Sequence, residues 1–335
     1  PLGQVVAIKV LPPSKAKNQQ MLGRFLREAR LALRLRHGNV VRTFQHAQTR
    51  EGMHYIVMEF LEGETLEEVL KRRGRLPPEE AARVLAQALA GLEHLNEQNV
   101  VHRDIKPGNL MLVPGTGANL EKTSNGCTVK VLDIGLGRSL FDEGGPGEEA
   151  GDLTSDGALV GTLHYMAPEQ ARNAHAADIR ADLYSLGCVA YEMISGKPPF
   201  TDGNFVVLMR KHAEEKPRPL AEQVPGLPPG LDKVIDRLLV KDPALRYGTP
   251  GLALKELTAQ VKEAATELKY AQPLPSYLDW LKAQEPEDTI KTDVADVGAA
   301  APLAGAVPAA TPLAAFPGPG PAAQGQPLWP WQARV

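Results

Sequence analysis

The chain has 335 residues and a formal net charge of −3, with 37 Lys and Arg balanced by 40 Asp and Glu. Such an even balance provides no strongly basic surface for nucleic acid or for an anionic membrane. Hydrophobic residues make up 43% of the chain, which is enough for a sizeable core. No apolar run reaches the roughly 18 to 20 residues that span a bilayer. Two cysteines are too few for a disulfide framework and favour a reducing compartment.

The first part of the chain is predicted to mix short strands with one helix. The stretch "QVVAIKVL", residues 4–11, is rich in β-branched residues and carries Lys9, which is typical of a strand. In residues 19–35 apolar side chains recur at helical spacing, with charges on the opposite face. A second strand is expected in residues 54–63, where Gly63 ends it.

Most of the following chain is predicted to be helical. Residues 77–98 open with Pro-Pro-Glu-Glu, a start signal, because proline fits the first turn and acidic side chains favour a helix N-terminus. Residues 181–196 are almost entirely apolar, as expected for a buried helix. A small strand-rich lobe followed by a larger helical lobe predicts an α+β fold with a cleft between the two lobes.

The C-terminal part changes composition. From about residue 285 the chain consists mainly of Pro, Ala and Gly, and no charge occurs between Asp296 and Arg334. Such a segment cannot bury enough apolar surface to offset its conformational entropy. We therefore expect a disordered tail or linker over residues 271–335.

The densest chemistry lies in residues 101–110, "VHRDIKPGNL", which combine Asp104, Lys106 and Asn109 in one loop. Phosphoryl transfer from ATP depends on positioning and on charge neutralisation more than on covalent chemistry. It needs a carboxylate for the attacking hydroxyl, a cation for the γ-phosphate and an oxygen ligand for Mg²⁺. These three residues supply those groups in that order, although any one of them alone would be compatible with a solvated polar loop.

Further motifs follow in an order that makes the chain resemble the eukaryotic-type protein serine/threonine kinases found in bacteria. A single "VAIK" would be weak evidence, but the ordered set is very specific and covers roughly residues 1–265. The motifs are "VAIK" at 6–9, "FLREAR" at 25–30, "HRDIKPGN" at 102–109, "LDIG" at 132–135, "APE" at 167–169, "DLYSLG" at 182–187 and "KDPALRYG" at 241–248.

The resemblance implies a role for each of these residues in binding ATP and the metal. Lys9 would hold the α- and β-phosphates of ATP and pair with Glu28. Asp133 would be the main ligand of Mg²⁺ or Mn²⁺, with Asn109 as a second ligand. Ile134 replaces the usual phenylalanine of the "DFG" motif, and we expect it to pack in the same way because an aliphatic side chain conserves most of the volume.

Adenine is expected between the lobes. The resemblance implies that it would lie against Ala7 and Met111 and would form hydrogen bonds with the backbone of the hinge, which includes Glu59 and Leu61. Met58 would form the back wall of this site.

Four other residues are expected to support the site without reacting. The resemblance implies that Asp182 anchors the catalytic loop and that Arg246 pairs with Glu169 of the "APE" motif. His102 is interpreted as a packed histidine.

The resemblance divides the chain into a partial small lobe (1–58), a hinge (59–63), a larger lobe (64–270) and the tail. The Gly-rich loop that covers the phosphates of ATP normally precedes "VAIK", so we expect that loop and the first two strands to be absent through truncation. A chain without them would be weakly active or inactive. Residues 114–128 are longer than the hairpin usual in the family and indicate a surface loop.

Regulation by autophosphorylation is expected before the "APE" motif. In similar kinases, cations such as Arg103 and Arg138 converge on a phosphate carried there. Thr154 and Ser155 are the candidates, whereas Thr162 is interpreted as structural. Unmodified loop residues are the alternative. Autophosphorylation between molecules would require a dimer.

Three function classes therefore compete. The first is a protein serine/threonine kinase with ATP and protein substrates as partners, in the cytoplasm, with a membrane anchor beyond Val335 in the full-length protein. The second is a pseudokinase or inactive fragment that acts as a binding or scaffold module. The third is a small-molecule kinase of the antibiotic or choline type, which generally lacks a platform such as "GTLHYMAPEQ" at residues 161–170.

Overall fold

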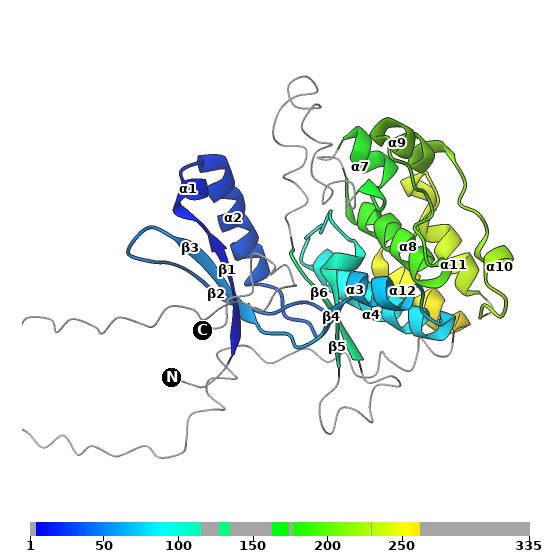
Figure 1. The fold of residues 1–335 in the computed structure, drawn as a ribbon, viewed down its shortest axis with the longest axis horizontal. Helices are drawn as coiled ribbons and strands as arrows, with labels where there is room; N and C mark the ends of the chain where they lie inside the picture. The colour runs from blue at the N-terminus through cyan, green and yellow to red at the C-terminus, as the bar shows by residue number, and fades with distance from the viewer. Residues whose placement is uncertain (1–4, 115–126, 135–162, 174–176, 229, 262–335) are drawn as a thin grey trace, which may run out of the picture.

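The computed structural model describes residues 5–114, 127–134, 163–173, 177–228 and 230–261, which form two lobes (Figure 1). The smaller lobe contains an antiparallel sheet with strand order β1-β3-β2 and two helices beside it. Its elements are β1 (Val6–Leu11), α1 (Pro13–Ala16), α2 (Gln19–Ala32), β2 (Thr43–Gln48) and β3 (His54–Glu59).

Helix α2 covers one face of this sheet. Asn18 begins the helix, and its side chain accepts hydrogen bonds from the backbone of Gln20 and Met21, which satisfies two donors of the first turn. Phe25 and Ala29 then face Leu11 and Ile56 of the sheet, and together they form the core of the lobe.

The larger lobe is mainly helical, with a second antiparallel sheet of order β4-β5-β6 on the side toward the small lobe. The strands are β4 (Glu64–Thr65), β5 (Leu110–Pro114) and β6 (Cys127–Val131). The helices are α3 (Leu66–Arg73), α4 (Pro78–Glu97), α7 (Pro168–Arg172), α8 (Ile179–Ser195), α9 (Phe205–Glu214), α10 (Leu220–Gln223), α11 (Leu231–Leu238) and α12 (Pro250–Gln260). Two 3-10 turns, Pro107–Asn109 and Pro243–Leu245, complete the described elements.

Helix α8 is the centre of the larger lobe. It packs against α4, α10, α11 and α12, and its side chains are buried over most of its length. A helix that is apolar on nearly all sides is stable only when the surrounding protein buries it. Its sequence therefore favours the central position. This placement lets Asp182 of α8 contact the backbone of the loop formed by residues 102–109.

A segment of the small lobe is fixed to β6 of the larger lobe. The backbone of Val41 donates to the carbonyl of Val131 at 2.9 Å, and the backbone of Val131 donates to the carbonyl of Asn39 at 2.8 Å. The buried Asn39 amide donates to Gln87 of α4 and to the carbonyl of Val129. This attachment connects the two lobes next to the residues that lead to Asp133.

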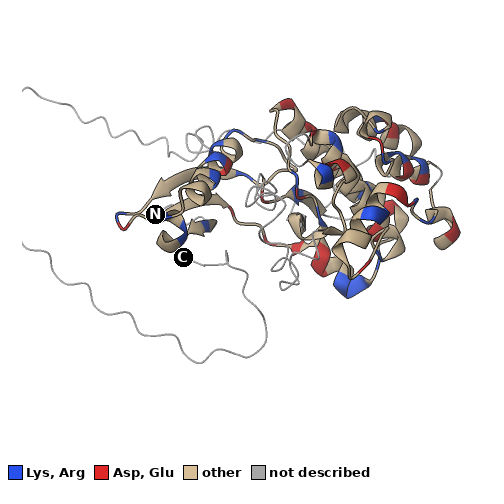
Figure 2. Cartoon of the chain, turned by 90° about the horizontal axis from the view of Figure 1, so that it is seen from above, with Lys and Arg blue, Asp and Glu red and all other residues tan. Residues whose placement is uncertain are grey.

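The fold class expected from the sequence, an α+β fold with a small sheet-containing lobe and a larger helical lobe, is confirmed. Basic and acidic residues are interspersed over both lobes (Figure 2), in agreement with the even charge balance. Within the described ranges, no helix is both long and apolar enough to cross a membrane. Several expected features lie outside these ranges: the tail 271–335, residues 115–126 of the long loop, and Arg138, Thr154, Ser155 and Thr162.

Candidate active site

Lys9 of β1 connects the two lobes. Its Nζ lies 2.7 Å from Glu28 Oε1 of α2 and 3.0 Å from Asp133 Oδ1, which follows β6. Burial alone would lower the pKa of Lys9, but the carboxylates of Asp133 and Glu28 outweigh it and raise the pKa above its ordinary value. Lys9 is therefore a fixed cation that can hold phosphate oxygens.

The loop formed by residues 102–109 is fixed by Asp182 of α8. Its two carboxylate oxygens accept the backbone N–H of His102 at 2.7 Å and of Arg103 at 2.6 Å. His102 is fully buried, its Nε2 lies 2.7 Å from the carbonyl of Leu132, and its Nδ1 accepts the backbone N–H of Asp104. His102 is thus a packed histidine, and these contacts fix the backbone that carries Asp104.

Asp104, Lys106 and Asn109 lie in direct contact. The Asn109 amide nitrogen donates to the Asp104 carbonyl at 2.7 Å and to Asp104 Oδ2 at 2.9 Å, and Lys106 Nζ lies 3.0 Å from the same Oδ2. The other oxygen, Asp104 Oδ1, is buried and has no hydrogen-bond partner among the described residues. A buried acceptor without a partner is unusual, so Oδ1 is available for a donor that arrives with a ligand.

Side-chain oxygens that could bind a divalent metal lie at the end of this loop, in Asn109, and after β6, in Asp133. Since the Asn109 side-chain nitrogen donates to Asp104, the side-chain oxygen is the atom that could bind a metal. The backbone carbonyl of Asn109 accepts the backbone N–H of Leu132, the residue before Asp133. Asp133 has a φ of +50°, a left-handed conformation that residues other than glycine adopt mainly where function requires it.

This donor set fits Mg²⁺ or a similar ion. Mg²⁺ is usually bound by one or two carboxylates together with waters and substrate phosphates, and it prefers oxygen ligands. Among the described residues there is no group of three or more His, Cys, Asp and Glu that would form a complete metal cage. A site built from Asn109 and Asp133 would therefore need the phosphates of a nucleotide to complete it.

The residues expected around adenine lie on β1, β3 and β5 and directly after β3. Ala7 of β1 is buried and pairs with Met58 of β3, and Met111 of β5 is buried in the larger lobe. Glu59 is the last residue of β3, and Leu61, which follows it, packs against the core of the larger lobe.

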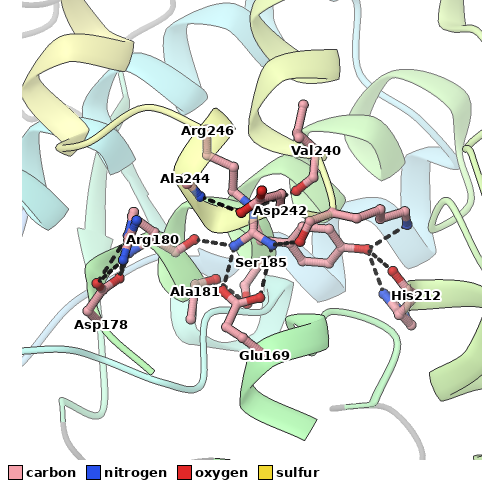
Figure 3. Close-up of polar contacts among 12 residues, drawn as sticks. Glu169, Asp178, Arg180, Ala181, Ser185, His212, Val240, Asp242, Ala244 and Arg246 are labelled. Atoms are coloured by element: carbon pink, nitrogen blue, oxygen red, sulfur yellow. Dashed lines mark hydrogen bonds and ion pairs between the residues drawn. The ribbon is translucent and has the colours of Figure 1, made fainter. Parts of the chain in front are cut away.

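An ion pair with a buried arginine holds the first turn of α7 (Figure 3). The Arg246 guanidinium, which is fully buried, donates to both oxygens of Glu169 at 2.5 and 2.9 Å. Its other N–H groups donate to three backbone carbonyls, and its plane lies over the ring of Tyr184 at 4.8 Å. Those carbonyls belong to Arg180, Val240 and Lys241. All five guanidinium donors are thus used, which stabilises the "APE" motif in one position.

Sequence reasoning missed three residues, two of them beside Asp104 and the third at Glu59. The Gln170 amide donates to the carbonyl of Arg103 at 2.8 Å, and the Tyr165 hydroxyl donates to Glu192 at 2.6 Å. Lys130 of β6 reaches Glu59 at 2.8 Å. Only Lys130 had a signal in the sequence, since it is a lysine inside an otherwise apolar strand.

The chain is similar to known kinases over most of its length. A family model described as the protein kinase domain matches residues 2–259. The chain is 35% identical over 256 residues to the probable serine/threonine-protein kinase PknB of Bifidobacterium longum, and 37% identical over 247 residues to the serine/threonine-protein kinase PknB of Mycobacterium tuberculosis. These alignments cover 74% and 73% of this chain but only 34% and 37% of the relatives, so the chain spans about a third of their length.

Among solved structures, the crystal structure of the Mycobacterium tuberculosis PknI kinase domain matches with a TM-score of 0.54. The alignment has 24% sequence identity and covers 76% of this chain and 85% of that chain, which supports the fold. The lobes, the order of the motifs and the family match agree with one another. The chain belongs to the protein kinase domain family.

Proposed function

We propose that this chain is the catalytic part of a protein serine/threonine kinase, which transfers the γ-phosphate of ATP to serine and threonine hydroxyls of proteins. The observation that carries the proposal is the geometry of Asp104. One of its oxygens is held by Asn109 and Lys106, and the other is buried without a partner among the described residues. A substrate hydroxyl is the donor that this free oxygen would accept.

In this reaction the substrate O–H would donate its proton to Asp104 Oδ1 while its oxygen attacks the γ-phosphorus. The bond between the γ-phosphorus and the bridging oxygen of the β-phosphate breaks, and ADP leaves. Lys106, which lies 3.0 Å from Asp104, would stabilise the charge on the transferred group. Lys9, held by Glu28, would fix the α- and β-phosphates and so align the bond that breaks.

Asn109 and Asp133 would hold Mg²⁺ or Mn²⁺ when nucleotide binds. Such an ion would neutralise the negative charge of the phosphates. Lys9 now lies 3.0 Å from Asp133, so the same cation that would contact phosphate also preorganises the metal ligand. Adenine would lie between Ala7 and Met111, with Met58 behind it and the backbone of Glu59 and Leu61 as its hydrogen-bonding partners.

The proposal includes the remaining features inferred from the sequence. The chain would consist of the partial small lobe 1–58, the hinge 59–63, the larger lobe 64–270 and the tail 271–335. Its partners would be ATP and protein substrates, with no role for nucleic acid. Because ATP is a cytoplasmic substrate, the kinase would act in the cytoplasm. Phosphorylation of Thr154 or Ser155 between two copies of the chain would regulate it.

The test is transfer of labelled phosphate from ATP to a generic protein substrate such as myelin basic protein, with choline and an aminoglycoside as alternative acceptors. Weak labelling, and of the protein alone, is expected. In Asp104→Asn, the rate should fall by about 10² or more, because the general base is lost. Asp202→Asn is the matched control, since Asp202 pairs with Lys211 in the larger lobe and lies outside the site.

Undiminished turnover in Asp104→Asn would contradict the role of this carboxylate. Binding of ATP without transfer to any acceptor would favour the alternative of a pseudokinase or inactive fragment. Labelling of choline or the aminoglycoside would favour a small-molecule kinase.

A further inference from the structure

Lys130 is a buried lysine in strand β6 of the larger lobe. It lies on β6, where its side chain is only 9% exposed, and its neighbours Val129 and Val131 are fully buried. A buried ammonium group is costly unless a carboxylate pairs with it. Its partner is Glu59, and Lys130 Nζ lies 2.8 Å from Glu59 Oε1. This pair joins β6 of the larger lobe to the first residue of the hinge.

Glu59 is held at both its side chain and its backbone. The oxygen that contacts Lys130 also accepts the backbone N–H of Arg42 at 2.7 Å, and the backbone N–H of Glu59 donates to the carbonyl of Arg42 at 2.9 Å. Glu59 is therefore clamped between Arg42 on one side and Lys130 on the other. Loss of Lys130 would leave a partly buried carboxylate with a single neutral donor, and this carboxylate would shift toward water.

The other end of this link is the segment that carries Asp133. Strand β6 is fixed by backbone hydrogen bonds of Val131 to Asn39 and Val41, and Leu132 is fixed by the carbonyl of Asn109. Lys130 thus projects from a rigid strand toward a hinge that has no helix or strand between Glu59 and β4. Because β6 is fixed by its backbone hydrogen bonds, Lys130 can hold the less regular segment that follows Glu59 in place.

We propose that Lys130 is a positioning residue for adenine recognition, which acts through Glu59 on the backbone of the hinge. This inference rests on the proposed function, because it assigns the hinge to adenine. Lys130 would not contact the nucleotide. Its charge would keep the Glu59 side chain turned toward β6, so that the hinge backbone faces the cleft in the geometry that adenine needs.

The test compares ATP with inorganic tripolyphosphate, which has the same three phosphates but no adenosine. ATP and inorganic tripolyphosphate, each with Mg²⁺, are titrated into the full chain and into Lys130→Met by calorimetry. We expect Kd for ATP to rise about tenfold in Lys130→Met, the usual effect of losing one charge-assisted hydrogen bond. Kd for tripolyphosphate should be unchanged, since Lys9 and the metal ligands remain in place. In turnover assays, KM for ATP should rise with little change in kcat.

Two further variants make the outcome specific. Lys130→Arg keeps the charge and the donor capacity, so it should recover most of the affinity for ATP. Lys211→Met, which removes a lysine from the ion pair with Asp202 away from the cleft, should behave like the unchanged chain. If Lys130→Met does not fold, Glu59→Gln provides the same test, because it keeps an acceptor for Arg42 but removes the charge that faces Lys130.

Equal affinity for ATP in Lys130→Met and the unchanged chain would overturn the inference. Parallel loss of ATP and tripolyphosphate binding would also overturn it, because Lys130 would then support the fold in general. Complete absence of ATP binding by the unchanged chain, weak binding included, would overturn the proposed function, and this inference with it.

Discussion

Single buried polar residues determine the geometry of this site. Asp182 is almost fully buried, and burial raises its pKa above the ordinary value, although His102 and the backbone N–H groups of His102 and Arg103 act in the opposite direction. Two N–H donors that point at one carboxylate fix both the carboxylate and the loop that donates. Arg103 adopts a φ of +67° in this loop. The strained backbone is therefore held in place by an anchor from a central helix.

A second buried polar residue, His212 of α9, makes the stability of the fold depend on pH. Burial, Lys241 and His164 lower the pKa of His212 from 6.5 to about 3. In the unfolded chain the histidine binds a proton below about pH 6.5, whereas the folded chain stays neutral down to about pH 3. Stability should thus fall as the pH decreases between these two values, by up to about 1.4 kcal/mol per pH unit from this residue.

The measurement is the free energy of unfolding in urea from pH 7 down to pH 4. His212→Gln should lose less stability over this interval, because glutamine does not titrate. The difference between the two pH profiles removes the contributions of His37 and of the carboxylates, which both proteins share. Identical slopes would show that His212 does not stay neutral in the folded chain.

For single residues, the sequence was a better guide to which residues to select for the candidate site than to the side-chain contacts that they form. The order of the motifs was enough to select Lys9, Asp104, Asn109 and Asp133, since each belongs to a short pattern with its own chemistry. It was not enough to show that one oxygen of Asp104 is left without a partner, because that depends on the side-chain directions of residues in the loop. Nor did it reveal the pair of Lys130 and Glu59, which are far apart in the sequence and belong to no common motif.

Among the elements, packing distances decide where a helix tolerates a larger side chain. Gly187 lies in α8, and a Cβ added there would meet Leu238 Cβ at 2.8 Å and Leu239 at 3.2 Å. These side chains belong to the end of α11, so α8 and α11 approach closely at this glycine. Gly23 lies in α2, where an added Cβ would meet nothing within 4 Å.

The same substitution should therefore have opposite effects at these two positions. Gly187→Ala should destabilise the chain by about 1–3 kcal/mol, because it overpacks a tight helix contact. Gly23→Ala should stabilise it by roughly 0.5–1 kcal/mol, because alanine favours the helix more than glycine does. Chemical denaturation of both variants checks this, and each serves as the control for the other. A stabilising Gly187→Ala would mean that α11 can move away at little cost.

The boundaries of the elements show what periodicity can and cannot predict. The helix expected over residues 77–98 is found as α4, Pro78–Glu97, because its start signals and its apolar face agree. The pattern over residues 19–35 continues beyond the end of α2 at Ala32. Leu35 explains the difference, since it is buried in the core of the larger lobe and not against the small sheet. Sequence spacing cannot distinguish these two kinds of burial.

In the whole molecule, we expect the relative position of the lobes to depend on a small polar cluster formed by Asn39, Gln87 and the backbone of Val129. Gln87 of α4 accepts hydrogen bonds from the Asn39 amide at 3.0 Å and from the backbone of Val129 at 2.8 Å. Asn39 belongs to the segment that comes from the small lobe, whereas Val129 belongs to β6, which leads to Asp133. Both lobes thus share one buried acceptor, and we expect the position of Lys9 next to Asp133 to depend in part on it.

Asn39 and Gln87 should therefore be energetically coupled. Asn39→Ala and Gln87→Met should each lower the free energy of unfolding by about 1–3 kcal/mol, because each leaves a buried group without its partner. The double variant should lose less than the sum of the two, since the first substitution has already removed their shared hydrogen bond. Gln223→Met is the control partner, because Gln223 contacts Tyr191 within the larger lobe and should be additive with Asn39→Ala. Denaturation of the full chain and of the five variants in the two cycles gives both coupling energies, and additivity of Asn39 with Gln87 would show that the lobes are held together elsewhere.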